Sequence, residues 1–131
     1  MIWYQNIFAS NSTNHSPKQR IVVDFDGTIA YDKGSDIGSP MKGVKEALEE
    51  LIKQYDVIIF SCRLTDRSDR EREQEKERMT KWLNEHEIPF TEIDDGTHGK
   101  PISEYIIDNK ALNYGGHEGD WEKIVRDILG N

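Results

Sequence analysis

Cysteine is nearly absent from this sequence, long apolar runs are missing altogether, and basic residues are fewer than acidic ones. The single cysteine, Cys62, excludes an internal disulfide and fits a reducing compartment, so we expect a cytoplasmic protein. No stretch approaches the roughly 20 apolar residues that a membrane-spanning helix needs, so no membrane partner is expected. With 25 acidic against 17 basic residues the formal net charge is -8. This charge disfavours nucleic acid as a partner unless a local basic groove overrides it.

The 131 residues suffice for one domain, and only 35% of them are hydrophobic, so the core must be small. We expect an N-terminal extension over residues 1–19 and a single domain over residues 20–131. The extension begins with an apolar cluster that includes Trp3 and Phe8, without the basic start or continuous apolar run of a secretory signal. Its aromatic side chains are expected either to pack on the domain or to stay mobile.

Short apolar runs alternate with segments of helical periodicity along the domain. Strands are predicted at residues 20–25, 56–60, 90–93 and 105–107, and helices from Pro40 to about residue 52, at 66–87 and at 121–129. This alternation predicts an α/β layer structure with a parallel sheet. In such sheets ligands bind beyond the carboxyl ends of the strands, so the polar residues there are the first candidates for a functional site.

Residues 66–78 hold six acidic and five basic residues and no large apolar one. We interpret this stretch as the solvated start of a helix that is anchored to the core only from Met79 onward. Ion pairs such as Asp69–Arg72 would support the helix. A sharper alternative is a clamp that holds a substrate or partner through Arg67, Arg70 and Arg72.

The main chemical signal closes the first predicted strand, in the run Asp24-Phe25-Asp26-Gly27-Thr28. Side chains alternate along a strand, so the two aspartates point the same way, and Gly27 permits a tight turn beside them. Two converging carboxylates are costly unless a cation or proton lies between them. Mg²⁺ is one solution, and a division into nucleophile and acid–base group is another. Capping of the turn is the plainer alternative, whereas a calcium loop lacks its later ligands.

Four segments together resemble a known family. The run VVDFDGTIA contains the two aspartates, VIIFSCR ends an apolar strand at Ser61, HGKP contains Lys100, and YIIDNKAL contains Asp108. In this order they resemble the four motifs of the haloacid dehalogenase (HAD) superfamily of aspartyl-phosphate enzymes. The resemblance covers roughly residues 21–112. It implies a three-layer, Rossmann-like parallel sheet with flanking helices.

The resemblance also implies a role for each motif residue. Asp24 would attack phosphorus, Asp26 would act as the acid and base, and Lys100 would neutralise charge. Mg²⁺ would be held by the side chains of Asp24 and Asp108 and by the backbone carbonyl of Asp26. The substrate-binding set consists of Ser61, Gly27, Thr28 and Arg63. Such roles suit phosphoryl transfer, in which catalysis is mainly positioning and stabilisation of charge.

The resemblance also limits the classes of reaction that are expected. Phosphatases and phosphomutases of the superfamily carry an aspartate at the place of Asp26, whereas its dehalogenases and cation pumps do not. The segments 29–39 and 87–99 are too short for a cap domain. A capless Mg²⁺-dependent phosphatase is therefore expected, acting on a nucleotide, a nucleic-acid end or another accessible phosphate. Asn109 stands where many members have a second acid.

Several site residues have a plainer interpretation. Ser61 could be an ordinary strand-end hydroxyl, Asp108 could cap a turn, and Lys110 is the rival of Lys100. Arg63 could pair with the acidic helix instead of contacting substrate. Asp94 and Asp95 are interpreted as a turn, although they form the competing acidic pair for the metal. Cys62 is expected to be a small packing residue, and the four histidines, which lack metal-ligand spacing, are expected at the surface.

One alternative function belongs to another class. A non-catalytic protein could keep the same fold and hold a partner through the charged helix or the N-terminal aromatic residues. The spacing of the five motif residues argues against it, because a pure binding protein does not need all of them.

Overall fold

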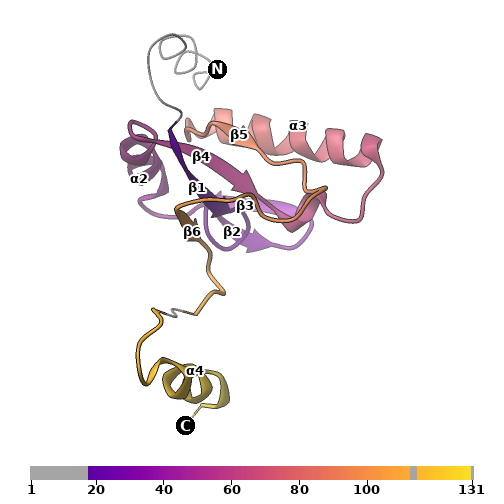
Figure 1. Ribbon diagram of the computed structural model, residues 1–131. Helices are drawn as coiled ribbons and strands as arrows, with labels where there is room; N and C mark the ends of the chain where they lie inside the picture. Colours follow the sequence, from indigo (N-terminus) through magenta and orange to yellow (C-terminus); the bar gives the residue numbers. More distant parts are fainter. Residues whose placement is uncertain (1–17, 113–114, 131) are drawn as a thin grey trace.

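A parallel sheet of four strands forms the centre of the molecule (Figure 1). The computed structural model describes residues 18–112 and 115–130, so the predicted N-terminal extension lies almost wholly outside the described residues. The strands are β1 (Gln19–Asp24), β4 (Tyr55–Phe60), β5 (Glu92–Ile93) and β6 (Tyr105–Ile107). Their order across the sheet is β5-β4-β1-β6, and every neighbouring pair is parallel. The predicted α/β fold and parallel sheet are confirmed.

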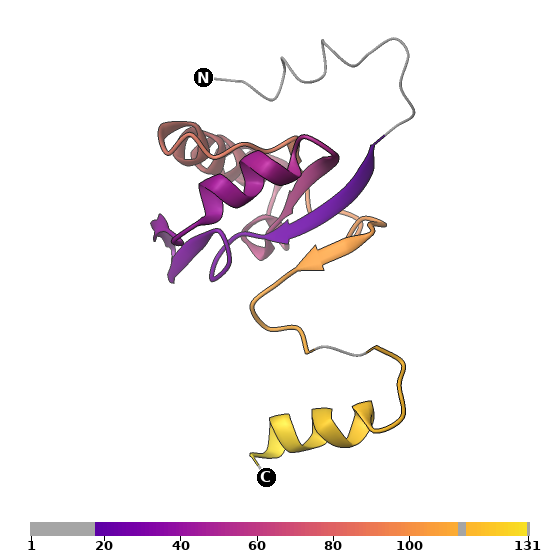
Figure 2. The same ribbon diagram turned by 90° about the vertical axis from the view of Figure 1, so that its left-hand side faces the viewer.

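One face of this sheet carries the hydrophobic core. Ile21 pairs with Val57 and Val23 with Ile59, and these alternate residues of β1 and β4 all point into one buried cluster. Two helices complete that cluster, α2 (Val44–Leu51) and α3 (Asp69–Glu85). Both follow right-handed crossovers that run in the same direction across the sheet, which places them on the same face (Figure 2). The described residues thus show two layers, and the predicted three-layer arrangement is not seen among them.

A hairpin replaces the loop that was expected before the first helix. It pairs β2 (Ala30–Lys33) with β3 (Asp36–Pro40) in an antiparallel two-stranded sheet. Pro40 ends β3 and does not open a helix, which begins only at Val44. Most side chains of the hairpin are exposed, so no hydrophobic alternation predicts these strands from the sequence.

The long helix α3 begins at a capping box. The Ser68 side chain accepts the N–H of Glu71, whose carboxylate accepts the N–H of Ser68 in return. The helix therefore starts three residues later than the predicted position. The predicted ion pair between Asp69 and Arg72 is present. Met79 is fully buried, which confirms that the core anchor begins there.

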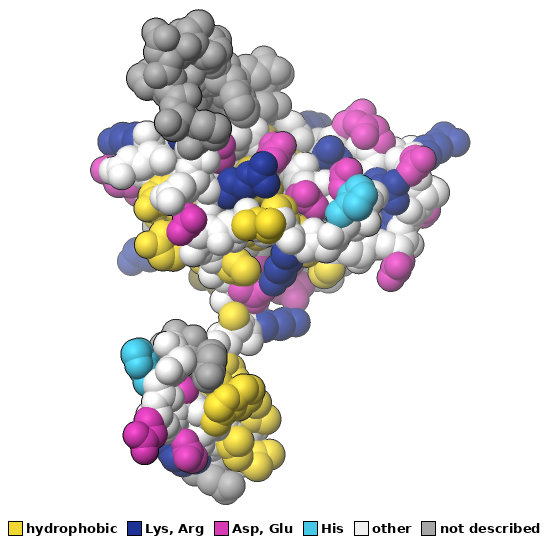
Figure 3. Space-filling model, in the orientation of Figure 1, with side chains coloured by type: hydrophobic (Ala, Val, Ile, Leu, Met, Phe, Trp, Pro, Cys, Tyr) yellow, Lys and Arg dark blue, Asp and Glu magenta, His cyan; other side chains and the backbone are white. Residues whose placement is uncertain are grey.

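The C-terminal helix α4 (Asp120–Leu129) lies apart from the sheet (Figures 1 and 2). The helix itself was predicted, but no residue in it is buried. Its hydrophobic side chains gather on one side and remain exposed (Figure 3). Strand β6 is likewise exposed, with Tyr105 at 59%. None of the described helices combines the length and the apolar character that crossing a membrane requires.

Candidate functional site

Three predicted site residues stand at the same edge of the sheet. Asp24 ends β1, Ser61 directly follows β4, and Asp108 directly follows β6. In the register of the sheet Asp24 lies opposite Phe60, and Val23 lies opposite Ile107. Because the three strands are parallel neighbours, their carboxyl ends meet at one edge. Because β1 lies between β4 and β6, Asp24 lies between Ser61 and Asp108 along this edge.

The carboxyl of Asp24 lies in an acidic environment. Burial raises its pKa above the ordinary value of 3.8, and the negative charges of Asp108 and Asp26 raise it further. A hydrogen bond with the backbone of Phe25 and the charge of Lys100 act in the opposite direction. Three carboxylates therefore lie near one another at this edge, and burial is the largest reason that the ionised form of Asp24 is disfavoured.

Lys100 reaches this cluster through Asp108. Its Nζ lies 3.4 Å from Oδ2 of Asp108, while Oδ1 of the same carboxylate accepts the backbone N–H of Lys110 at 2.7 Å. These hydrogen bonds lower the pKa of Asp108, the backbone one most strongly. The plainer expectation that Asp108 caps a turn is thus confirmed. Lys110, the rival lysine, contributes its backbone N–H to this turn.

A tight turn after Asp24 shapes the floor of the site. The carbonyl of Phe25 accepts the N–H groups of Ile29 and Ala30, at 2.9 and 3.1 Å, so the chain reverses at once. Gly27 has a φ of 82° there, a conformation that favours glycine. A Cβ on this glycine would lie 2.4 Å from Nδ2 of Asn109. The turn after β1 and the loop after β6 are therefore in direct contact, which makes Asn109 part of the cluster.

The two hydroxyl groups in the predicted substrate-binding set, those of Ser61 and Thr28, differ in whether they have a hydrogen-bond partner. Ser61 is buried, and its Oγ accepts the backbone N–H of Arg63 at 3.1 Å. This contact is that of a strand-end hydroxyl, which caps the short 3₁₀ helix η1 (Cys62–Leu64). The Oγ1 of Thr28 is buried and finds no hydrogen-bond partner among the described residues. A buried hydroxyl left in this way costs about 1–3 kcal/mol.

Arg63 is buried and binds protein groups with its whole guanidinium. It forms a bidentate ion pair with Asp26, with Nε to Oδ2 at 2.6 Å and Nη2 to Oδ1 at 2.9 Å. It also reaches Glu75 of α3 at 3.1 Å, so the predicted pairing with the acidic helix is present. The neighbouring hydrogen bonds keep the pKa of Arg63 above its ordinary value despite the opposing effect of burial. The expected contact with substrate has no free donor in this arrangement.

The donor atoms at this edge suit a hard divalent cation. Asp24 and Asp108 offer carboxylate oxygens and Asp26 offers a backbone carbonyl, which are ligands that Mg²⁺ prefers. This set contains only two side chains, and the described residues hold no cluster of three or more His, Cys, Asp or Glu that could bind a metal. The burial of the Asp24 carboxyl beside Asp108 and Asp26 is the feature that fits a cation.

The remaining candidates lie elsewhere. Asp94 accepts the N–H of Gly96 and Asp95 accepts that of Thr97, which confirms the interpretation of this acidic pair as a turn. Cys62 is exposed, so the expectation of a packing residue is wrong, because η1 turns its side chain away from the core. The three described histidines are exposed as expected; they are His86, His98 and His117.

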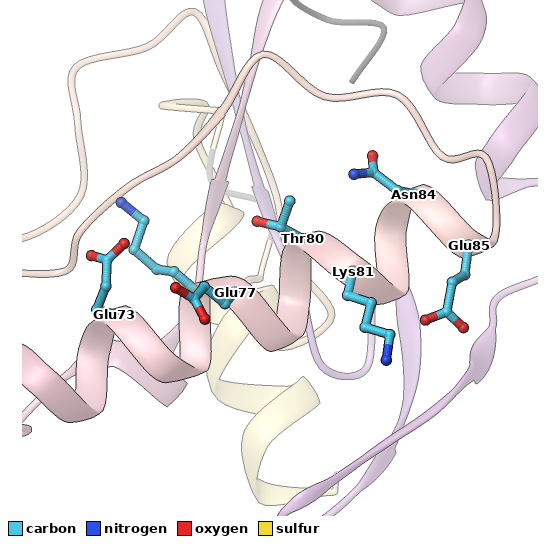
Figure 4. Close-up of a pocket in the computed structure, with 7 residues that line it drawn as sticks. Glu73, Glu77, Thr80, Lys81, Asn84 and Glu85 are labelled. Atoms are coloured by element: carbon cyan, nitrogen blue, oxygen red, sulfur yellow. The ribbon is translucent and has the colours of Figure 1, made fainter. Parts of the chain in front are cut away.

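A groove along α3 offers no second site. It is lined by Glu73, Lys76, Glu77, Thr80, Lys81, Asn84 and Glu85. Figure 4 shows Thr80 and Asn84 pointing toward the neighbouring loop, whereas Lys81 and Glu85 point to the opposite side. These side chains do not converge, and none of the predicted site residues lines the groove.

The structure adds two residues that the sequence did not single out. Glu75 was one acid among many in the charged stretch, yet its side chain is only 13% exposed and pairs with Arg63. Arg78 was also in that stretch, and it binds the carbonyl of Ser35 in the β2–β3 turn at 2.7 Å. The contact of Arg78 depends on the unpredicted hairpin, and Glu75 meets Arg63 from a separate element of the chain, so no local pattern could have revealed either contact.

The comparisons with known proteins bear on the fold alone. A scan against protein-family models finds no match, and a search of curated proteins finds none either. Among solved structures, the chain is similar to a conserved protein of Bacteroides thetaiotaomicron, with a TM-score of 0.53 and 22% sequence identity. The match covers 86% of this chain and 91% of that one. The described arrangement of sheet and helices thus has a counterpart in a solved protein.

Proposed function

We propose that this chain is a capless, Mg²⁺-dependent phosphatase of the HAD superfamily that works through an aspartyl-phosphate. The observation that carries the proposal is the position of Asp24 at the end of the central strand. Asp108 and Lys100 lie beside it, joined at 3.4 Å. These three residues come from distant parts of the sequence. Capping a turn would explain Asp108 alone, and it would not require Asp24 and Lys100 to lie close to it.

The proposed reaction has two displacements. A carboxylate oxygen of Asp24 attacks phosphorus, the bond to the leaving oxygen breaks, and Asp26 gives its proton to that oxygen. In the second step Asp26 takes a proton from water, whose oxygen attacks the phosphorus. The bond between phosphorus and Asp24 then breaks, and inorganic phosphate leaves. Asp26 regains its proton, so the cycle is balanced.

Positive charge must accompany these steps, because a carboxylate and a phosphate repel each other. Lys100 lies beside Asp108 and supplies one such charge. Asp24, Asp108 and the carbonyl of Asp26 would hold Mg²⁺, which would neutralise negative charge between the nucleophile and the phosphate.

The substrate class follows from the lack of a cap. The hairpin of β2 and β3 occupies residues 30–40, and a short connection joins α3 to β5, so neither segment holds an inserted domain. The site is thus open to bulky molecules. Accessible phosphates on nucleotides or nucleic-acid ends fit it, with charge repulsion disfavouring long nucleic acids.

Phosphate release tests this proposal directly. The native protein should hydrolyse p-nitrophenyl phosphate and some member of a panel of nucleotides, sugar phosphates and phosphorylated oligonucleotides. EDTA should abolish the activity and Mg²⁺ should restore it. Asp24→Asn should lose about 1,000-fold or more, as expected on removal of a nucleophile. Asp95→Asn, in the exposed turn, is the matched control and should retain activity. Equal activity of Asp24→Asn and the native protein would refute the proposal.

A further inference from the structure

We propose that Arg63 is a positioning residue that fixes Asp26 relative to the β2–β3 turn and does not touch the substrate. This inference rests on the proposed function and concerns how its acid–base group is held. The bidentate pair sets both the position and the plane of the Asp26 carboxylate, because two parallel hydrogen bonds leave little rotation.

The other donors of Arg63 bind the turn of the hairpin. The carbonyls of Gly34, Ser35 and Asp36 accept from its guanidinium at 3.0, 3.0 and 2.6 Å. With Asp26 and Glu75 this makes six contacts for five N–H groups. No donor is left over for a phosphoryl oxygen. The side chain is only 7% exposed, so a phosphate would have to displace these partners to reach it.

Two carboxylates surround this single guanidinium, so its positive charge is already balanced. Glu75 and Asp26 approach it from different elements, α3 and the turn after β1. A phosphate dianion would meet net negative charge here. Arg63 therefore differs from Lys100, which is 45% exposed and, among the described residues, pairs with the carboxylate of Asp108 alone.

The pair is compatible with both steps that Asp26 performs. A protonated carboxyl keeps one acceptor oxygen, so it can accept an N–H of Arg63 while its O–H points to the leaving group. After the proton leaves, the second hydrogen bond forms again. The guanidinium thus acts on the reaction through Asp26, and its loss should matter most where the leaving oxygen needs a proton.

Leaving-group dependence is the decisive measurement. p-Nitrophenolate leaves with little need for a proton, whereas an alkyl oxygen needs one. For Arg63→Lys we expect kcat/KM to fall about 100-fold on an alkyl phosphate but less than about 10-fold on p-nitrophenyl phosphate, in the range of acid–base effects. Arg78→Lys is the matched control, because Arg78 binds the same Ser35 carbonyl and the same Glu75 but not Asp26. It should leave the ratio between the two esters unchanged.

A double-mutant cycle separates positioning from a general structural effect. In Asp26→Asn, the added change Arg63→Lys should cost less than about 3-fold, because the two residues act as a unit. Equal losses on both esters, or losses that add fully, would overturn the proposal. If the native protein is active but the losses are equal on both esters or fully additive, only the positioning role of Arg63 is overturned. If the native protein has no phosphatase activity, both the phosphatase proposal and the positioning role are overturned.

A second measurement does not depend on the stability of Arg63 variants. In the native protein, the Nε–H of Arg63 should give a slowly exchanging NMR signal that inorganic phosphate with Mg²⁺ does not shift. The signal should be lost in Asp26→Asn and kept in Arg78→Lys. A shift on addition of phosphate would show contact with the ligand and would overturn the positioning role.

Discussion

The amide nitrogen of Asn109 lies 2.4 Å from where a Cβ on Gly27 would be, so the turn after β1 and the loop after β6 are packed without space between them. Gly27 also has a φ of 82°. The glycine is therefore required twice, once by its backbone conformation and once by the approach of Asn109. This contact joins the loop that carries Asp108 to the turn that follows Asp24.

Gly27→Ala should separate the two loops. We expect a loss of about 2–3 kcal/mol in the free energy of unfolding, the sum of a strained backbone and a displaced Asn109. Phosphatase activity should fall with it. Gly43→Ala is the control, because Gly43 has a nearly identical φ of 84° and open space around it. It should lose only about 1 kcal/mol. Chemical denaturation measures both, and equal losses would contradict the role given to Asn109.

Lys100→Met should reduce kcat by about 100-fold, because in the proposed reaction its positive charge neutralises the nucleophile and the phosphate. Lys110→Met should have little effect, since Lys110 serves Asp108 through its backbone N–H, which the substitution keeps. Steady-state kinetics with p-nitrophenyl phosphate compare the two variants. A larger loss for Lys110→Met would transfer the role to that lysine.

Asp24→Asn should stabilise the fold at neutral pH in the absence of divalent cations. Burial and neighbouring carboxylates raise the pKa of Asp24 in the folded state, so its ionised form is less favourable there than in the unfolded chain. The gain should be below about 1 kcal/mol, because the carboxyl is partly exposed and screened by solvent. It should fade as the pH falls through 3.8, the ordinary value, because the carboxyl then becomes protonated in both states. Urea denaturation at pH 3.5 and 7 tests the sign, and destabilisation at pH 7 would contradict it.

Met79→Ala should cost about 2–5 kcal/mol, since it opens a cavity where α3 meets the core. Met79 is fully buried in the main cluster. The neighbouring Thr80→Ala, on a partly exposed position of the same helix, should change stability by less than about 0.5 kcal/mol. Thermal unfolding distinguishes the two, and a small effect of Met79→Ala would mean that α3 is anchored elsewhere.

Apolar runs made the central sheet predictable. The valines and isoleucines of β1 and β4 form continuous hydrophobic segments because residues on both faces of these strands are buried, Val22 and Ile58 on the face opposite the core cluster included. Because parallel strands have their carboxyl ends at the same edge of a sheet, the polar residues that follow these strands are predicted to lie together. This reasoning places Asp24, Ser61 and Asp108 in one candidate site. The rule that parallel strands end together needs no coordinates.

Other features were decided only by tertiary contacts. The β2–β3 hairpin is exposed and polar, so nothing in its composition marks it as paired strands. Arg63 could not be assigned from the sequence, because its partners come from the turn after β1, from the hairpin and from α3. A guanidinium has five N–H donors, and the residues next to Arg63 in the sequence do not determine which acceptors those donors bind. Which carboxylates and carbonyls it binds is fixed only when separate elements pack around it.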